Sequence, residues 1–418
     1  MNRMMKRFFR TFLVAAAFAV AWSCSRDEPA VVPRPEPEER PELTEKQALR
    51  DAVEKLASAS RTDFSTLRGV EVWQEGYKAS GAWFGPDGER NDDKARKTRH
   101  LMWSVTKTFT GMAVGMAVAE GKVSLDEKLY DLFPEEADAA LADVGNRNVT
   151  PEQVANLKAC TVRNLLTMTC GHKEDPTVSH GTRFAIGHVL SIGDYLNAGG
   201  VDVDKVLETE GSTLVRMFFA FPFEDEPGTN FTYNSLGSHM LAEILRKKTG
   251  ENPADWLDSR LFKPLGIAKP AWEQVQGVSA GGWGLHLATD EMLAFGRLLL
   301  EGGLHEGRQL VPADYLKAAA SAHVEFGAGK KPYDATGYGY QTWVFPQGFM
   351  ATGLFGQYII VLPARKAVIA LASDAPFSFA SFNPLVDGPK ILSLLQGASA
   401  SGNDALLDLV WQYILPAL

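Results

Sequence analysis

The stretch SVTKTFTGMAVGMAVAEG, residues 104–121, decides the expected fold. Its residues are small or apolar on most faces of a helix, which predicts a buried central helix that stops at Gly121. Before it, residues 45–58 have the pattern of an amphipathic helix, and GVEVWQEGYKASGAWFGP, residues 69–86, predicts two strands around a turn. The chain therefore begins its folded part with strands and then buries a helix.

The rest of the chain predicts an interrupted sheet. Helical patterns dominate from about 125 to 300, whereas strand character returns at 337–346, 348–363 and 367–373 and a final helix covers 403–415. Strands at both ends with helices between them predict an α/β domain with helices over its sheet and an inserted all-α part. We expect one domain over 45–418, with its α/β part at about 45–124 and 335–418 and its helical part at about 125–334.

Composition and charge exclude several functional classes. The 418 residues carry a net charge of −9 without a long basic run, which argues against nucleic-acid binding. The eight histidines show no metal-binding spacing, and no glycine run fits a phosphate-binding loop, so no cofactor is expected. His100 and His172 are interpreted as structural, and the free Cys160 and Cys170 as packing residues.

The N-terminus predicts export. Basic residues precede about twelve apolar residues, a run too short to span a bilayer, so residues 1–23 are expected to be a removed signal peptide. The ending at Cys24 resembles the lipobox of bacterial lipoproteins, which implies lipidation of that cysteine and a protein of the cell envelope, in the outer membrane or the periplasm. Ordinary cleavage after 19–21 is the alternative. Residues 24–44, rich in proline and acid, predict an extended tether.

Ser104 and Lys107 form the S-x-x-K of this sequence at the start of the central helix. Residues three apart share a helix face, so the amine can reach the hydroxyl, and burial would lower the lysine pKa enough to make it a base. A helix-capping serine with an incidental lysine is the alternative. Tyr233, in Tyr233-Asn234-Ser235 after a Pro-Gly turn, is a candidate partner base, and a packing role is its alternative.

With these motifs the sequence resembles the serine β-lactamase and penicillin-binding family, in particular class C β-lactamases, D,D-carboxypeptidases and related esterases and amidases. The resemblance runs from about residue 100 to the C-terminus and implies an antiparallel sheet flanked by helices. It implies that Ser104 is the acylated nucleophile, Lys107 its base partner and Tyr233 the general base. Ser235 stands where the family has asparagine, so amide contacts to substrate would be lost. The segments that carry it are RHLMWSVTKTFTG, RNLLTMTCGH, EPGTNFTYNSLGSHMLAEILRKKTG, GGWGL and GLFGQYIIVLP.

The family's third motif is a Lys-Thr-Gly or His-x-Gly strand, and two segments compete for it. Residues 248–250 read Lys-Thr-Gly but follow a helical run, so Gly250 is interpreted as a helix cap. Ala351-Thr352-Gly353 lies in a strand-like stretch and is the better match. By resemblance, Ser104 and Leu354 would supply the oxyanion-hole N–H groups. Ala351 replaces the cation that holds a substrate carboxylate, which disfavours penicillins.

Two competing functions stay open. Residues 277–281 satisfy G-x-S-x-G, the nucleophile elbow of α/β-hydrolases, but lack a clear preceding strand and following helix around Ser279. A non-catalytic envelope-binding lipoprotein would explain Ser235 and Ala351. The favoured prediction is a secreted serine hydrolase that cleaves an ester or amide, including peptidoglycan-like peptides or β-lactams, through a Ser104 acyl-enzyme.

Overall fold

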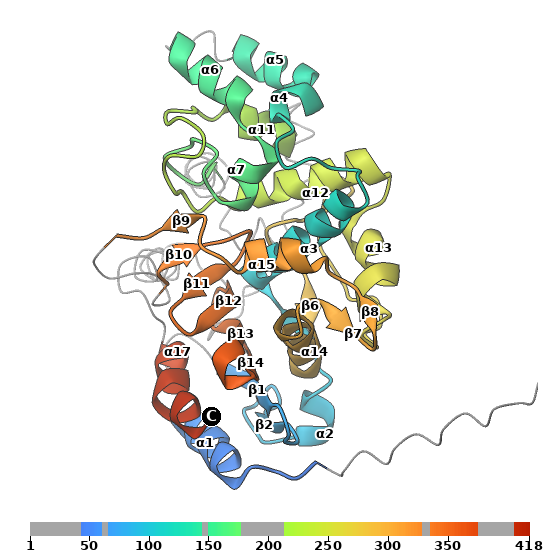
Figure 1. The fold of residues 1–418 in the computed structure, drawn as a ribbon, viewed down its shortest axis with the longest axis vertical. Coiled ribbons are helices and arrows are strands. Elements are labelled where there is room, and N and C mark those ends of the chain that lie inside the picture. Colours follow the sequence, from blue (N-terminus) through green and yellow to red (C-terminus); the bar gives the residue numbers. More distant parts are fainter. Residues whose placement is uncertain (1–42, 61–65, 144–148, 177–212, 328–334, 375–404) are drawn as a thin grey trace, which may run out of the picture. The chain divides into compact units, whose positions relative to one another are not determined.

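An eight-stranded antiparallel sheet lies at the centre of the unit 43–418 (Figure 1). The computed structural model describes residues 43–60, 66–143, 149–176, 213–327, 335–374 and 405–418. The strand order is β2-β1-β14-β13-β12-β11-β10-β9. The strands are β1 (Thr66–Gln74), β2 (Ser80–Trp83), β9 (Val324–Glu325), β10 (Gly337–Tyr338), β11 (Trp343–Phe345), β12 (Gly348–Gly353), β13 (Gln357–Leu362) and β14 (Ala367–Asp374).

The sheet joins the two ends of the domain, as the sequence predicts. β1, near the start of the domain, pairs with β14 from Thr66↔Asp374 to Gln74↔Ala367. β12 and β13 form a hairpin that continues the sheet on the other side of β14. All six residues of β13 are buried, which explains the unbroken apolar run of that strand.

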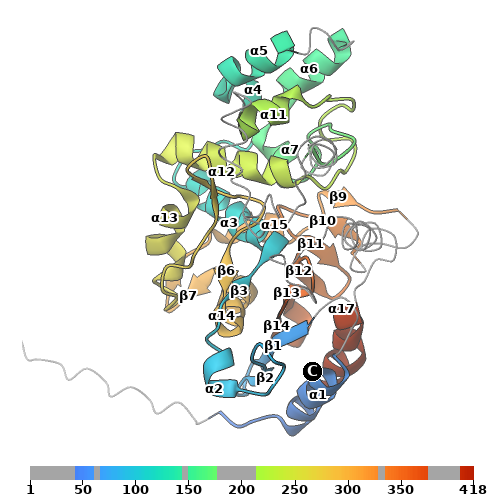
Figure 2. The ribbon, with the colours of Figure 1, turned by 180° about the vertical axis from the view of Figure 1, so that it is seen from behind.

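Helices cover both faces of the sheet. On one face α1 (Gln47–Ala59) packs on β1 and β2 beside the C-terminal segment of α17 (Ala405–Leu409), η7 (Val410–Ile414) and η8 (Leu415–Ala417). On the other face α14 (Thr289–Leu300) packs on β13, β14 and β1 (Figure 2). Gly296 permits this approach, because a Cβ there would lie 2.5 Å from Cγ1 of Val368.

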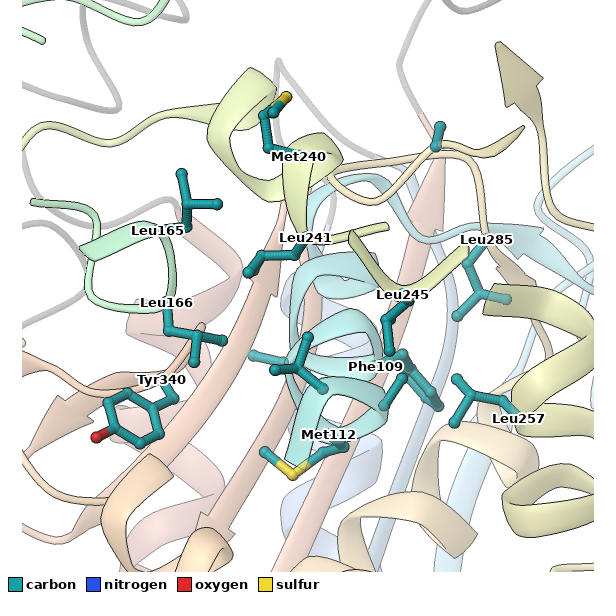
Figure 3. Close-up of a cluster of buried hydrophobic side chains, with 14 of the residues drawn as sticks. Phe109, Met112, Leu165, Leu166, Met240, Leu241, Leu245, Leu257, Leu285 and Tyr340 are labelled. Atoms are coloured by element: carbon teal, nitrogen blue, oxygen red, sulfur yellow. The ribbon is translucent and has the colours of Figure 1, made fainter. Parts of the chain in front are cut away.

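Helix α3 (Thr106–Ala119) is the buried central helix that the sequence predicts. Every residue from Thr106 to Ala117 is buried, and the short 3-10 helix η1 (Trp103–Val105) precedes it directly. Phe109 and Met112 of α3 lie among apolar side chains from α7, α12 and α13 (Figure 3). α3 therefore connects the sheet domain to the helical part, whose members are α4 (Leu129–Leu132), α5 (Pro134–Asp143), α6 (Pro151–Ala159), α7 (Val162–Leu166), α11 (Leu214–Ala220), α12 (Ser235–Thr249) and α13 (Pro253–Leu257), followed by the π-helical η3 (Asp258–Phe262).

The sheet also uses residues from the segment 125–334, which the sequence predicts to be mainly helical. α14 covers the sheet, and β9 forms its last strand. Three two-stranded pairs also lie partly or wholly in this segment, namely β3 (His100–Leu101) with β6 (His286–Leu287), β4 (Gln274–Val275) with β5 (Val278–Ser279), and β7 (Leu304–His305) with β8 (Arg308–Gln309). These strands of two residues are too short for a periodic signal. The remaining elements are α2 (Asp92–Ala95), α15 (Ala313–Ala319) and η5 (Pro363–Arg365).

Cys160 and Cys170 are free and buried, which confirms their interpretation as packing residues. Within the described ranges, no helix combines the length and apolar character needed to cross a bilayer. Residues 1–42 lie outside the described residues, and with them the predicted signal peptide, Cys24 and most of the tether.

Candidate active site

Ser104 lies in η1, two residues before the first residue of α3. Trp103 before it has φ of 48°, a left-handed conformation that is costly for a bulky residue and recurs at functional sites. Ser104 itself is half-buried, whereas its neighbours Trp103 and Val105 are buried. The turn therefore holds the Ser104 hydroxyl between two buried apolar side chains, those of Trp103 and Val105.

Lys107 reaches this hydroxyl. Its Nζ lies 2.8 Å from Oγ of Ser104 and also donates to the carbonyl oxygen of Gly282 at 2.8 Å. The side chain is 1% exposed. Burial lowers the pKa of Lys107 from 10.5 to about 7, and the negative charge of Asp175 opposes that shift. A large share of the molecules therefore holds a neutral amine beside Ser104 near neutral pH.

Tyr233 brings a phenol ring to the same amine. Nζ of Lys107 lies 4.8 Å from the centroid of the Tyr233 ring. The ring stacks on Trp343 of β11 at 5.6 Å with an interplanar angle of 20°. This packing fixes the ring beside Lys107, so the structure brings together the three side chains that the sequence predicts as catalytic.

Helix α12 begins directly after Tyr233, and two side chains cap its start. Oδ1 of Asn234 accepts from the backbone N–H of Gly237 at 2.7 Å. The backbone N–H of Ser235 donates to Oδ2 of Asp175 at 2.9 Å. Both contacts satisfy N–H groups that a helix start leaves open, so the caps hold Tyr233 at a fixed place.

The end of β12 lies against the Ser104 turn. A Cβ on Gly353 would collide with the carbonyl oxygen of Met102, which requires glycine at this close approach. Phe355, with φ of 66°, meets Trp103 edge-on at 5.3 Å between ring centroids. Leu354 lies between these two contacts, which places its peptide group close to the segment that carries Ser104.

Ala351 and Thr352 occupy adjacent positions of β12 and point to opposite faces of the sheet. Ala351 is 4% exposed and belongs to the same buried cluster as Trp103 and Phe109. Its methyl group offers no charge on the side of the sheet that faces α3. Thr352 is buried as well, and its role as a substrate contact stays a prediction.

The competing motifs have structural roles. Gly250 has φ of 76° and caps the end of α12, and Nζ of Lys248 bonds Oε1 of Glu127 at 2.6 Å, so the literal Lys-Thr-Gly is a helix end. Ser279 is fully buried in β5. Its Oγ accepts from the N–H of Ala254 at 3.4 Å, and no helix follows it directly, which is unlike a nucleophile elbow.

The two histidines near the site are also held by structural contacts. Nδ1 of His172 lies 3.0 Å from Nδ2 of Asn234, and burial lowers the pKa of His172 to about 3, so its imidazole stays neutral. Nδ1 of His100 lies 3.2 Å from Oδ1 of Asp374 at the end of β14. Both contacts agree with the structural interpretation.

Sequence reasoning missed two groups of this site. Gly282 lies in the segment GGWGL, which carries the family resemblance but gives Gly282 no role in the sequence analysis, and its carbonyl oxygen accepts a hydrogen bond from Lys107. A Cβ at Gly282 would lie 2.7 Å from the carbonyl oxygen of Ser235, so this loop packs tightly on α12. Asp175 stands in no recognisable motif, and only the fold brings it to Ser235.

The groups around Ser104 can activate its hydroxyl as a nucleophile. In the described part of the chain, no group of three or more His, Cys, Asp or Glu side chains lies close enough to hold a metal ion. Ser104 has an amine and a phenol ring near it and a strand end beside it. A nucleophile, a proton acceptor and backbone N–H donors are the elements of acyl transfer. These contacts are the ones that a serine hydrolase with a Ser-x-x-Lys centre would use.

The chain belongs to the Beta-lactamase family, whose family model matches residues 66–384. It is 24% identical over 349 residues to the 6-aminohexanoate-dimer hydrolase of Paenarthrobacter ureafaciens, covering 78% of this chain and 76% of that protein. It is 26% identical over 193 residues to the lovastatin esterase of Penicillium rubens, covering 46% and 43%. Among solved structures, the hydrolase EstCE1 matches with a TM-score of 0.58 at 16% identity, covering 84% of this chain and 99% of that chain.

These matches confirm the predicted family and the predicted fold, an α/β structure with a large antiparallel sheet flanked by helices. The relatives are hydrolases, and the chain is an enzyme of the β-lactamase-related serine hydrolases.

Proposed function

We propose that this protein hydrolyses a small ester or amide through a covalent acyl-enzyme on Ser104. The observation that carries the proposal is the 2.8 Å contact between Oγ of Ser104 and the buried amine of Lys107. A buried amine with a pKa of about 7 can accept the serine proton at neutral pH. A capping serine would need neither this burial nor this partner.

The reaction proceeds in two stages. Oγ of Ser104 bonds to the carbonyl carbon of the substrate while its proton passes to the Lys107–Tyr233 pair. The N–H groups of Ser104 and Leu354 stabilise the oxyanion, and loss of one such donor typically costs about 3 kcal/mol of transition-state stabilisation. The carbon–leaving group bond then breaks, and the leaving group takes the proton. In the second stage Tyr233 removes a proton from water while the water oxygen bonds to the acyl carbon of the acyl-enzyme. The bond from that carbon to Oγ of Ser104 then breaks, the carboxylic acid leaves, and the proton held by Tyr233 passes to Oγ.

The site favours substrates without a required carboxylate. Ala351 supplies a methyl group where a cation would hold a carboxylate, so free peptide C-termini and penicillins gain no ion pair there. One relative is named as a hydrolase of the 6-aminohexanoate dimer and another as an esterase. Those names support an ester or amide substrate here, with D-amino peptides and β-lactams as weaker candidates.

Export belongs to the same proposal. The sequence of residues 1–24 supports secretion and lipidation at Cys24, with a tether that reaches the domain from the envelope membrane. Ser235 and Ala351 also favour a second candidate, a binding lipoprotein that retains the site without turnover. In that case the protein would bind an envelope ligand but would not release an acyl product.

The substrate test compares matched carbonyl compounds on the purified full-length protein. We expect turnover of p-nitrophenyl butyrate, no stable adduct with a penicillin, and less than about threefold preference between a D-alanyl peptide and its C-terminal amide. Ser104→Ala should abolish turnover, and Ser279→Ala is the control that should retain it. Strong preference for the free carboxylate, or a stable penicillin adduct, would contradict the inference from Ala351. Absence of any turnover would favour the binding lipoprotein.

A further inference from the structure

The segment 168–175, which follows α7, is joined to the segment that carries Tyr233 by a series of contacts. The N–H of Thr232 donates to the carbonyl oxygen of Met168 at 2.8 Å, and the N–H of Gly228 donates to that of Thr169 at 2.8 Å. Nδ2 of Asn234 lies 3.3 Å from Sγ of Cys170. The last of these contacts is the bond from the N–H of Ser235 to Asp175. The position of Tyr233 therefore depends on this segment.

Asp175 differs from the other members of the series because its side chain is charged and half-exposed at the site. Its carboxylate raises the pKa of Lys107, against the lowering by burial. The other groups placed around Lys107 are neutral: Ser104, the carbonyl of Gly282 and the ring of Tyr233. The nearby Lys173 pairs with Glu224 at 3.0 Å.

We propose that Asp175 is a positioning residue of the active site: its carboxylate anchors the start of α12, and with it Tyr233, and its negative charge acts on the Lys107 amine. This inference rests on the proposed function. Its geometric basis is the bond that the backbone N–H of Ser235 donates to Oδ2 of Asp175 at 2.9 Å.

The test is the pH profile of fluorophosphonate labelling, measured as a second-order rate on the full-length protein. The wild-type rate should fall below about pH 7, where Lys107 becomes protonated. Asp175→Asn keeps an oxygen for the Ser235 N–H but removes the charge, so Lys107 loses its proton more easily. We expect this acid limb to move to lower pH by roughly 0.5–1 unit. A merely structural role would change the rate at all pH values but would not move the limb.

Three further variants complete the design. Glu174→Gln, an exposed neighbour, is the matched control and should leave the limb in place. Asp175→Glu keeps the negative charge and should have the acid limb of the wild-type protein. Asp175→Ser removes the charge with a smaller side chain and replaces Asp175→Asn if that variant does not fold. A limb that stays within about 0.2 unit of wild type in folded Asp175→Asn and Asp175→Ser would overturn the proposal. Failure of the wild type to label at Ser104 would overturn the proposed function itself, and this inference with it.

Discussion

At the scale of single residues, the site depends on a lysine that the fold keeps from water. Lys107 is buried to 1% exposure between η1 and the Gly282 loop, and its pKa of about 7 follows mainly from desolvation. Such burial costs stability, because the unfolded chain keeps the lysine charged in water. The same burial that lowers the stability of the folded protein also keeps the Lys107 amine neutral beside Ser104.

Replacement of this lysine therefore predicts a pH-dependent gain in stability. The folded pKa of Lys107 is about 7 and the usual value is 10.5, so the unfolded state binds more protons between those values. The cost of burying the charge is fully present below pH 7 and disappears as the pH rises towards 10.5. Lys107→Met should raise the free energy of unfolding at pH 7 relative to wild type, and this advantage should shrink by roughly 3 kcal/mol by pH 10.

Urea unfolding at pH 7, 8.5 and 10 measures this difference. Lys55→Met, at an exposed position of α1, is the matched control and should show no comparable pH-dependent change relative to wild type. A difference between Lys107→Met and wild type that is constant with pH would show that Lys107 is charged in the folded protein.

At the scale of elements, the sequence predicts individual helices and strands better than it predicts which elements pack against them. The central helix and the β1–β2 hairpin follow from periodicity and turn residues, and the structure confirms them. The strand character at 348–363 is confirmed as well, but the structure divides this stretch into the two paired strands β12 and β13. α14 has a helical pattern too, but its packing on the sheet depends on contacts between residues far apart in the chain. Periodicity shows that a helix has an apolar face and does not show which element covers that face.

The contact of α14 with the sheet predicts a large effect at Gly296. A Cβ there would lie 2.5 Å from Cγ1 of Val368 and 2.9 Å from Cγ2 of Ile359. Gly296→Ala should lower the free energy of unfolding by about 1–3 kcal/mol, although alanine favours a helix by about 1 kcal/mol elsewhere. Chemical denaturation measures this change in the free energy of unfolding. Gly237→Ala in α12, whose nearest atoms lie at 3.3–3.5 Å, is the comparison and should be near neutral. If Gly296→Ala left the free energy of unfolding unchanged, α14 would have to lie further from β13 and β14 than the structure shows.

At the scale of the whole domain, the active site forms where segments distant in the chain meet. Ser104 comes from η1 and Lys107 from the start of α3, whereas Tyr233 lies just before α12 and Leu354 just after β12. Motifs of particular residue types make the first three predictable. Asp175 accepts from the backbone N–H of Ser235, and the carbonyl oxygen of Gly282 accepts from Lys107. Contacts with backbone groups of this kind leave no pattern in the sequence. Their roles follow only from the fold.

Intact-mass spectrometry of the full-length protein after reaction with a fluorophosphonate tests the central claim most directly. The account predicts a single adduct, located at Ser104 by peptide mapping and absent from Ser104→Ala. The buried Ser279 should remain unmodified. An unlabelled wild-type protein, or an adduct on Ser279, would contradict the assignment of Ser104 as the nucleophile.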